Sequence, residues 1–591
     1  MHRTSSVLSK SRKLLLPILF LTQFLYAQTG DIPIPEWTTE FSKQNTTWNW
    51  FGKLNLSNPE KSLWEWNVSE SFNSNLLIPS EGKKQWKDEH KFDGFYYYPL
   101  SELDLGIYGK SWIQSDRQVS SDNRFENHII GVTAKFDKTP GFSIKPYSGY
   151  QQSVNRSNTD WGWDAGVQGT LNNYELGDYR ANLQFDSDYD FYKSRQNFEN
   201  QIGMQVATRF NNFTSDSLSL SYSETSKQYY GATSSDLLHL TLYNRSIDNR
   251  LVYRLSSGNL ITLDTKIFSK NISSVSSRDV LQFENRIRFY RIGRKLSYNL
   301  SLWTNDETQD NTGIRTDSRT RQTAVGLQSS YKIDQNNHFS IDFDYVKLQY
   351  DTPDSVNNND DRDEQRFVIH LNYTHRFSPL LEMRWQAYTY LYHQIYIFRE
   401  QSANNNWNRV FRLNPQVIYK YNNTTNTLST SVQANYTVYD FDPKSEQIRS
   451  YIFRKYTISD SLITPFYKKL NIGIHSRLEL EEKGSFFKDE FAQNKIQSHR
   501  SQFLNIFLYH EKIFQMRVTA GYSLYARQEW RHVPVKKKVR DIINQGPYLT
   551  LLYHHSERLD FSAYAALSTL DDSQSAKTSY STGQIKLYYN F

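Results

Sequence analysis

The feature that most constrains this chain is a strict alternation of apolar with polar or small residues over stretches of about ten residues. The clearest stretch runs from Met516 to Ala526, where every second residue is apolar. A period of two is typical of a β-strand with one apolar and one polar face. The length suits a tilted strand that crosses a bilayer, which takes about 9–11 residues.

The same alternation recurs at 218–222, 367–374, 381–387 and 432–438. Beyond residue 27, no apolar run approaches the length of a spanning helix, so any membrane insertion must be as a closed β-barrel. The mean hydropathy of −0.72 is compatible with this, because half of each strand in a large barrel faces a polar lumen. The 42 Tyr and 35 Phe suit the aromatic girdles of such a barrel, and would also suit a carbohydrate-binding β-protein.

The connections between these stretches are of two kinds. Short turn sequences such as Ser256–Asn259 and Asp334–Asn337 alternate with longer polar segments. The longer segments are 305–317, 351–365, 482–495 and 529–541. This alternation is typical of barrels with short periplasmic turns and longer extracellular loops, and a β-sandwich has no reason to sort its loops in this way.

The last eight residues also alternate. Ile585, Leu587, Tyr589 and Phe591 share one face, and Lys586 lies on the other. This terminal strand resembles the closing strand of bacterial outer-membrane β-barrel proteins, in which a terminal Phe is the usual assembly signal. The resemblance implies an all-β, transmembrane, antiparallel up-and-down barrel in the outer membrane, surrounded by lipid and lipopolysaccharide and inserted by the barrel-assembly machinery. No narrower family resemblance is evident.

Three segments are predicted along the chain. Residues 1–27 read as a secretory signal peptide, because an apolar core of about eight residues follows several basic residues and is too short to span a bilayer. Residues 28–59 are predicted to be a periplasmic lead-in or a small plug, and residues 60–591 a barrel of about 26 strands (24–28). A further candidate strand at 43–56 would make the number odd, so it is assigned to the lead-in. About thirty residues cannot form the large plug of TonB-dependent transporters.

Catalytic and metal chemistry is not expected. The chain has no Cys, which excludes thiolate metal sites, haem attachment and catalytic thiols. The 14 His show no HExxH or comparable spacing. The formal charge of +7 includes four basic residues of the signal segment, so no nucleic-acid partner is predicted. No cofactor is predicted either. An outer-membrane enzyme is disfavoured, because such enzymes use narrow barrels that hold catalytic groups rigidly.

Two groups of residues are candidates for function. The candidates for the lumen are Asp342, Asp344, His370, Glu382, Arg384, Gln433, Arg517, Arg527 and Lys586. The candidates for extracellular loops are Asp360, Asp361, Lys536, Lys537 and Lys538. Because both signs of charge are present in the first group, strong ion selectivity is not expected.

The predicted function is an outer-membrane channel or conduit. A barrel of this width would leak if it were open, so its lumen is expected to be filled by loops or by a partner protein, as in an export pore or the sheath of a larger complex. A surface adhesin or scaffold that displays its loops is the alternative. Within the barrel, the apolar phase shifts between 339–345 and 346–350, which predicts a β-bulge near Tyr345.

Overall fold

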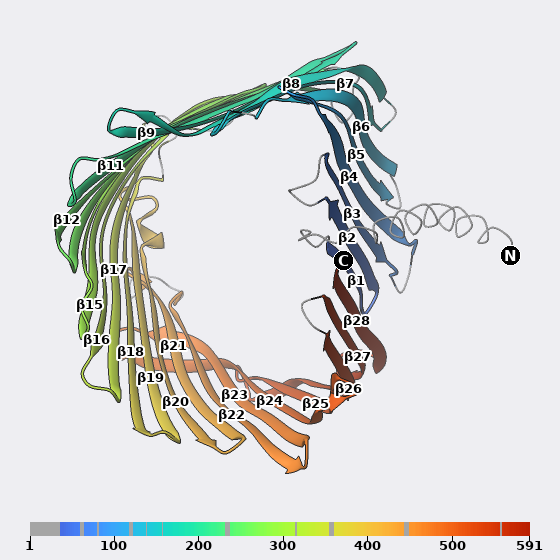
Figure 1. The fold of residues 1–591 in the computed structure, drawn as a ribbon. Coiled ribbons are helices and arrows are strands. Elements are labelled where there is room, and N and C mark those ends of the chain that lie inside the picture. Colours follow the sequence, from blue (N-terminus) through green and yellow to red (C-terminus); the bar gives the residue numbers. More distant parts are fainter. Residues whose placement is uncertain are drawn as a thin grey trace.

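The computed structural model describes residues 36–58, 64–79, 82–117, 122–137, 139–156, 158–230, 237–313, 316–353, 358, 360–442, 448–555 and 558–591. These residues form a single antiparallel sheet of 28 strands (Figure 1). The first fourteen strands are β1 Glu36–Gln44, β2 Thr47–Ser57, β3 Glu65–Leu77, β4 Gln85–Pro99, β5 Asp104–Arg117, β6 Asp122–Lys135, β7 Phe142–Asn155, β8 Asn158–Leu176, β9 Tyr179–Tyr192, β10 Gln196–Arg209, β11 Thr214–Tyr230, β12 Leu237–Ser256, β13 Asn259–Ser273 and β14 Ser277–Arg291.

The remaining strands continue the same up-and-down order, and the described part of the chain also includes the 3₁₀ turn η2 Ser402–Asn404 between β19 and β20. They are β15 Leu296–Thr312, β16 Ser318–Lys332, β17 Asn337–Asp351, β18 Arg362–Ser378, β19 Leu381–Tyr396, β20 Asn406–Tyr421, β21 Thr424–Tyr439, β22 Tyr451–Tyr467, β23 Leu470–Phe487, β24 Ala492–Ile513, β25 Met516–Arg531, β26 Lys537–His555, β27 Leu559–Asp572 and β28 Thr578–Asn590. In the part of the chain described, no helix has the length and apolarity needed to cross a bilayer.

The sheet closes on itself. Each strand pairs with its sequence neighbours, and β28 also pairs with β1, with Glu36 opposite Asn590 and Gln44 opposite Thr582. Figure 1 shows the resulting ring, in which the first and last strands lie side by side. Closure leaves no sheet edge without a hydrogen-bonded partner, which is a condition for a β-sheet to reside in lipid.

The strand number and the lead-in assignment need correction. The barrel has 28 strands rather than 26, because β1 and β2 lie within the predicted lead-in at 28–59. The segment at 43–56 is not one strand: it includes a tight turn at Asn45, whose φ of 54° is left-handed, a conformation that Asn adopts more readily than most residues. A hairpin adds two strands, so the number stays even. The predicted signal peptide at 1–27 lies outside the described residues.

The register separates a mainly apolar face from a mainly polar face around the sheet. Along one row, Leu302 lies opposite Val325, which lies opposite Tyr345. Apolar side chains on this face stand free of protein neighbours, and Ile130 and Ile107 are 73% and 61% exposed. Such exposure in water would be costly, at about 25 cal/mol per Å² of apolar surface, whereas in hydrocarbon it costs nothing. The apolar face is therefore the outer, lipid-facing surface.

The predicted β-bulge at Tyr345 is wrong. Strand β17 pairs with β16 and β18 in continuous register, so Val346 and Leu348 simply lie on the inner face. The phase changes because this part of the strand lies toward its extracellular end, where the outer face no longer has to be apolar. On β24 both faces carry apolar residues near Leu504, and the register places Leu504 and Ile506 on the outer face, opposite Leu524 and Tyr522 of β25.

The long polar segments are mostly strand rather than loop. Residues 305–312 belong to β15, and 482–487 to β23. The strands have 9 to 22 residues, and most exceed the 9–11 needed to cross a bilayer, so their polar ends continue the backbone ladder outside it. At the end where β1 begins, taken as periplasmic, most turns are short. At the other end the connections range from two residues after β1 to the segment 440–450 after β21.

A small apolar cluster caps the extracellular ends of β20 to β23. Val438, Ile452 and Phe486 are 0–4% exposed and pack against Trp407 and Tyr436. It is the one cluster of fully buried apolar side chains among the described residues. This part of the rim therefore has a folded core of its own, separate from the membrane-facing belt.

The inner wall of β5 to β9 is unusually closely packed. The ring of Tyr108 lies against Gly131 and Gly149 of the next two strands, and its hydroxyl donates a hydrogen bond to Asp164 Oδ2 at 2.7 Å. Tyr147 lies in the same way against Gly166 and donates to Asp188 Oδ1 at 2.9 Å. Glycine permits this arrangement, because a Cβ at these positions would meet ring or backbone atoms at less than 3 Å.

Candidate functional site: the inner wall of the barrel

The polar face opposite the lipid-facing belt lines the lumen. Along one row of this face, Asp342 lies opposite His370, which lies opposite Tyr388. The row continues through Arg412 to Gln433. The nine residues predicted for the lumen all lie on this polar face: Asp342, Asp344, His370, Glu382, Arg384, Gln433, Arg517, Arg527 and Lys586.

The structure brings only some of these residues together, and it does so through ion pairs. Glu382 Oε2 accepts from Arg376 at 3.0 Å, and Glu382 Oε1 lies 2.6 Å from Arg384. Arg527 pairs with Glu529 at 2.8 Å. Arg376 and Glu529 were not among the sequence candidates, and they become visible only when the strands are placed in register. Such pairs cancel charge locally, which leaves little net field for selecting ions.

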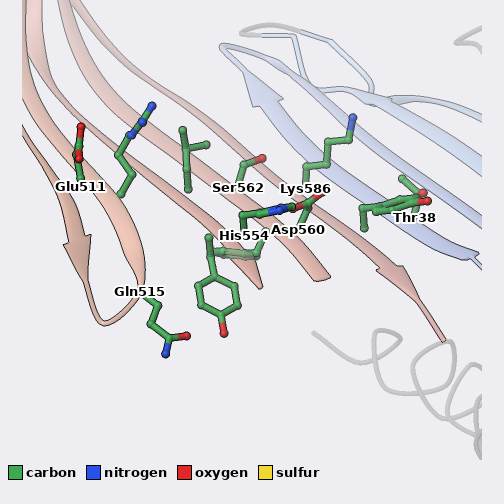
Figure 2. A pocket seen from close by; sticks show the side chains of 12 residues that line it. Thr38, Glu511, Gln515, His554, Asp560, Ser562 and Lys586 are labelled. Atoms are coloured by element: carbon green, nitrogen blue, oxygen red, sulfur yellow. The ribbon is translucent and has the colours of Figure 1, made fainter. Parts of the chain in front are cut away.

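A recess of about 630 Å³ lies at the periplasmic mouth, beside the seam between β28 and β1. Two predicted residues, Arg517 and Lys586, line it together with Glu511. Figure 2 shows Lys586 close to the paired side chains of His554 and Asp560, with Thr38 of β1 at one side. Cations and carboxylates are mixed in this recess, so its charge does not define a ligand.

The terminal strand is held on both sides. Ile585 lies opposite Phe41 of β1 and Ala563 of β27. Leu587 and Tyr589 share this outer face, and the ring of Phe591 lies 4.9 Å from that of Tyr589. The terminal apolar residues therefore belong to the lipid-facing belt at the periplasmic rim, and their role in assembly stays a prediction.

The extracellular candidates have structural partners. Asp361 accepts hydrogen bonds from the Thr352 backbone N–H at 2.7 Å and from Asn358 Nδ2 at 2.9 Å, so it closes the loop between β17 and β18. Asp360 pairs with Arg362 at 2.9 Å. These contacts leave the acidic loop with fewer free carboxylates than its sequence indicates.

The basic segment lies partly in a strand. Lys536 is in the loop after β25, whereas Lys537 and Lys538 begin β26, and Lys538 pairs with Asp541. No group of three His, Asp or Glu side chains among the described residues could hold a metal ion.

Comparison with known proteins gives structural similarity only. No family model and no curated protein matches the sequence. Similar solved structures include the ferripyoverdine receptor FpvA of Pseudomonas aeruginosa, with TM-score 0.42, 7% identity, and coverage of 94% of this chain and 72% of FpvA. Others are BauA, the ferric preacinetobactin receptor of Acinetobacter baumannii (TM-score 0.40, 9% identity, coverage 95% and 80%), and the copper transporter OprC (TM-score 0.39, 8% identity, coverage 95% and 81%). At these scores the similarity supports no functional argument.

The barrel itself defines the class of protein. A closed antiparallel sheet with an exposed apolar outer face and a polar inner face cannot be stable in water, and it satisfies every requirement for residence in lipid. The chain is an integral β-barrel protein of the bacterial outer membrane.

Proposed function

We propose that the protein is a wide conduit across the outer membrane whose lumen is filled, in its working state, by a separate partner. It would then serve as an export pore or as the sheath of a larger complex. The observation that carries this proposal is the closed ring of 28 strands with a continuous polar inner face.

The width of the ring follows from the number of strands. With neighbouring strands about 4.8 Å apart and tilted by roughly 40°, 28 strands enclose a cylinder roughly 50–60 Å across between backbones. Barrels of 16–18 strands already leave an aqueous channel. A ring of 28 that held nothing would let periplasmic solutes escape.

The chain's own loops are too short to close such a ring. One of the longest connections, 440–450, leaves β21 and returns to β22, so it reaches at most about 19 Å from the wall. A partner therefore accounts for occlusion better than the loops do.

Single-channel recording on the barrel purified without its partner tests this proposal. We expect a stable conductance larger than that of a 16-stranded porin in the same bilayers, and a fall in conductance when the co-purifying fraction from mild detergent is added back. A barrel that stays closed when pure would show that its own segments occlude it and would overturn the partner proposal.

A second candidate function is a surface adhesin or scaffold, which the folded extracellular cap of β20 to β23 favours. In that case, deletion of residues 443–447, in the connection between β21 and β22 beside this cap, should abolish binding of the surface ligand and leave permeability unchanged. Loss of permeability control without loss of binding would argue against this candidate.

A further inference from the structure

A second recess of about 470 Å³ lies in the inner wall between β14 and β18. Small residues form its floor, since Ala324 and Gly326 of β16 lie in its centre. Long side chains bound it, with Arg286 and Trp303 on one side and Arg366 on the other. Its volume falls in the range of about 300–1,000 Å³ that is typical of small-molecule sites.

The arginines of this recess differ in how they are engaged. Arg286 pairs with Glu284 at 3.1 Å and stacks on Trp303 at 5.6 Å, and Arg288 pairs with Asp264. Arg366 is exposed and has no hydrogen-bond or ion-pair partner among the described residues. Its planar guanidinium is therefore free to bind a carboxylate through two parallel hydrogen bonds.

The rest of the lining offers partners for hydroxyl groups. Asp344 is exposed and also has no hydrogen-bond or ion-pair partner in the described part of the chain, and an ionised carboxylate can only accept. Asn299 donates to Gln328 at 3.4 Å, while its Oδ1 and the Trp303 indole N–H are buried without a partner. Buried polar atoms left unpaired indicate a site completed by water or by a ligand.

The two unpaired charged groups of the recess indicate which class of ligand it could bind. A ligand that presents an acid to Arg366 and a hydrogen-bond donor to Asp344 would pair both groups, and a sugar that carries a carboxylate and hydroxyls fits this description. Aromatic rings continue along the wall from Arg366, because Tyr392 lies opposite it and stacks on Tyr390 with ring centroids 6.4 Å apart. A peptide that bound by β-strand addition would need a free sheet edge, and the closed ring offers none.

We infer that the recess between β14 and β18 binds an acidic sugar unit and serves as a recognition point for an acidic polysaccharide that passes through the conduit. This inference rests on the export-pore form of the proposed function, in which the cargo travels along the inner wall. The Arg366 guanidinium holds the sugar carboxylate, and Asp344 accepts from a neighbouring hydroxyl.

Isothermal titration calorimetry on the full barrel in detergent tests the inference, with trigalacturonic acid as the probe and maltotriose as its neutral counterpart. We expect the acidic trimer to bind at least tenfold more tightly than the neutral one. Arg366→Gln should weaken binding of the acidic trimer at least tenfold. Arg180→Gln, which changes an exposed arginine on β9 outside the recess, should leave it unchanged.

The possible results separate this inference from the proposed function. Equal binding of both trimers, or no effect of Arg366→Gln, would refute the inference that the recess binds an acidic sugar. A large conductance of the same preparation would still support the proposed conduit. Tighter binding of an oligoglutamate peptide than of the acidic trimer would also overturn it, in favour of a protein cargo. Sugar binding by a barrel that never conducts would refute the conduit and leave only the binding site.

Discussion

The inner walls of β5 to β9 and of β14 to β18 are built from the same alternation of residues, yet they differ in how polar groups are held. On the first wall, the ring of Tyr108 lies against Gly131, and Asp164 is only 1% exposed. On the second wall, Gly326 has no aromatic ring above it, and the exposed Asp344 stands beside it. Aromatic cover over glycine thus turns one stretch of wall into a buried network, and its absence leaves a recess.

The largest expected loss of stability comes from adding a side chain at Gly131, where the strands and the Tyr108 ring of the β5 to β9 wall approach closely. In Gly131→Ala, the new Cβ would lie 2.4 Å from the Ser148 carbonyl oxygen and 2.6 Å from the Tyr108 ring. Because backbone cannot move aside easily, we expect the free energy of unfolding to fall by about 3 kcal/mol, the upper end of the range for overpacking. Urea unfolding of the barrel in lipid vesicles, followed by tryptophan fluorescence, measures this.

Gly203→Ala on the inner face of β10 is the matched control, since no heavy atom lies within 4 Å of its Cβ position. Its effect should stay within about 0.5 kcal/mol. If both substitutions cost the same, the close approach of strands on the first wall is not what stabilises it.

A smaller effect is expected from removing one hydrogen bond of the buried network. Tyr108→Phe keeps the ring over Gly131 but leaves Asp164 without its donor at 2.7 Å. An unsatisfied buried acceptor costs about 1–3 kcal/mol, and the same unfolding experiment measures it. Tyr388→Phe on β19 is the control, because no hydrogen bond of its hydroxyl is found among the described residues, and it should be close to neutral. Equal losses in the two variants would mean that the network adds nothing to stability.

The smallest change in the free energy of unfolding is expected from a substitution on the wall formed by β14 to β18. Arg366→Gln removes an exposed guanidinium without a partner, so the free energy of unfolding should change by less than about 0.5 kcal/mol. Thermal unfolding of the same preparation used for sugar binding provides the measurement. A loss above 1 kcal/mol would show that Arg366 supports the wall rather than a ligand.

The sequence predicted what depends on local alternation. The all-β barrel, the polar face with Asp342 and Lys586, and the terminal strand all follow from a period of two. The prediction of a single strand at 43–56 is wrong, because Asn45 forms the turn of a hairpin between β1 and β2. The polar strand ends also read as loops in the sequence, since polarity alone does not show where backbone hydrogen bonding stops.

The candidate recess could not be predicted from the sequence, for a different reason. Arg286 and Arg366 are 80 positions apart along the chain, and only the register of five strands brings them to the same row. The same holds for Tyr108 and Asp164, which meet across the glycines of the strands between them. To predict such a contact, the length of every intervening strand and turn must be known. An error of one residue in any predicted turn would place the two side chains on opposite faces of the sheet.

The pairing of Glu36 with Asn590 has a consequence for biogenesis. Until β28 meets β1, the nascent sheet carries two rows of unsatisfied amide and carbonyl groups, and neither can be sheltered by the other. All 27 pairings between consecutive strands must therefore form while both edges of the sheet are protected from pairing with other proteins. The barrel satisfies its own backbone hydrogen bonds only when β28 finally pairs with β1. A cell that makes this protein must therefore protect an open sheet during almost the whole of its insertion.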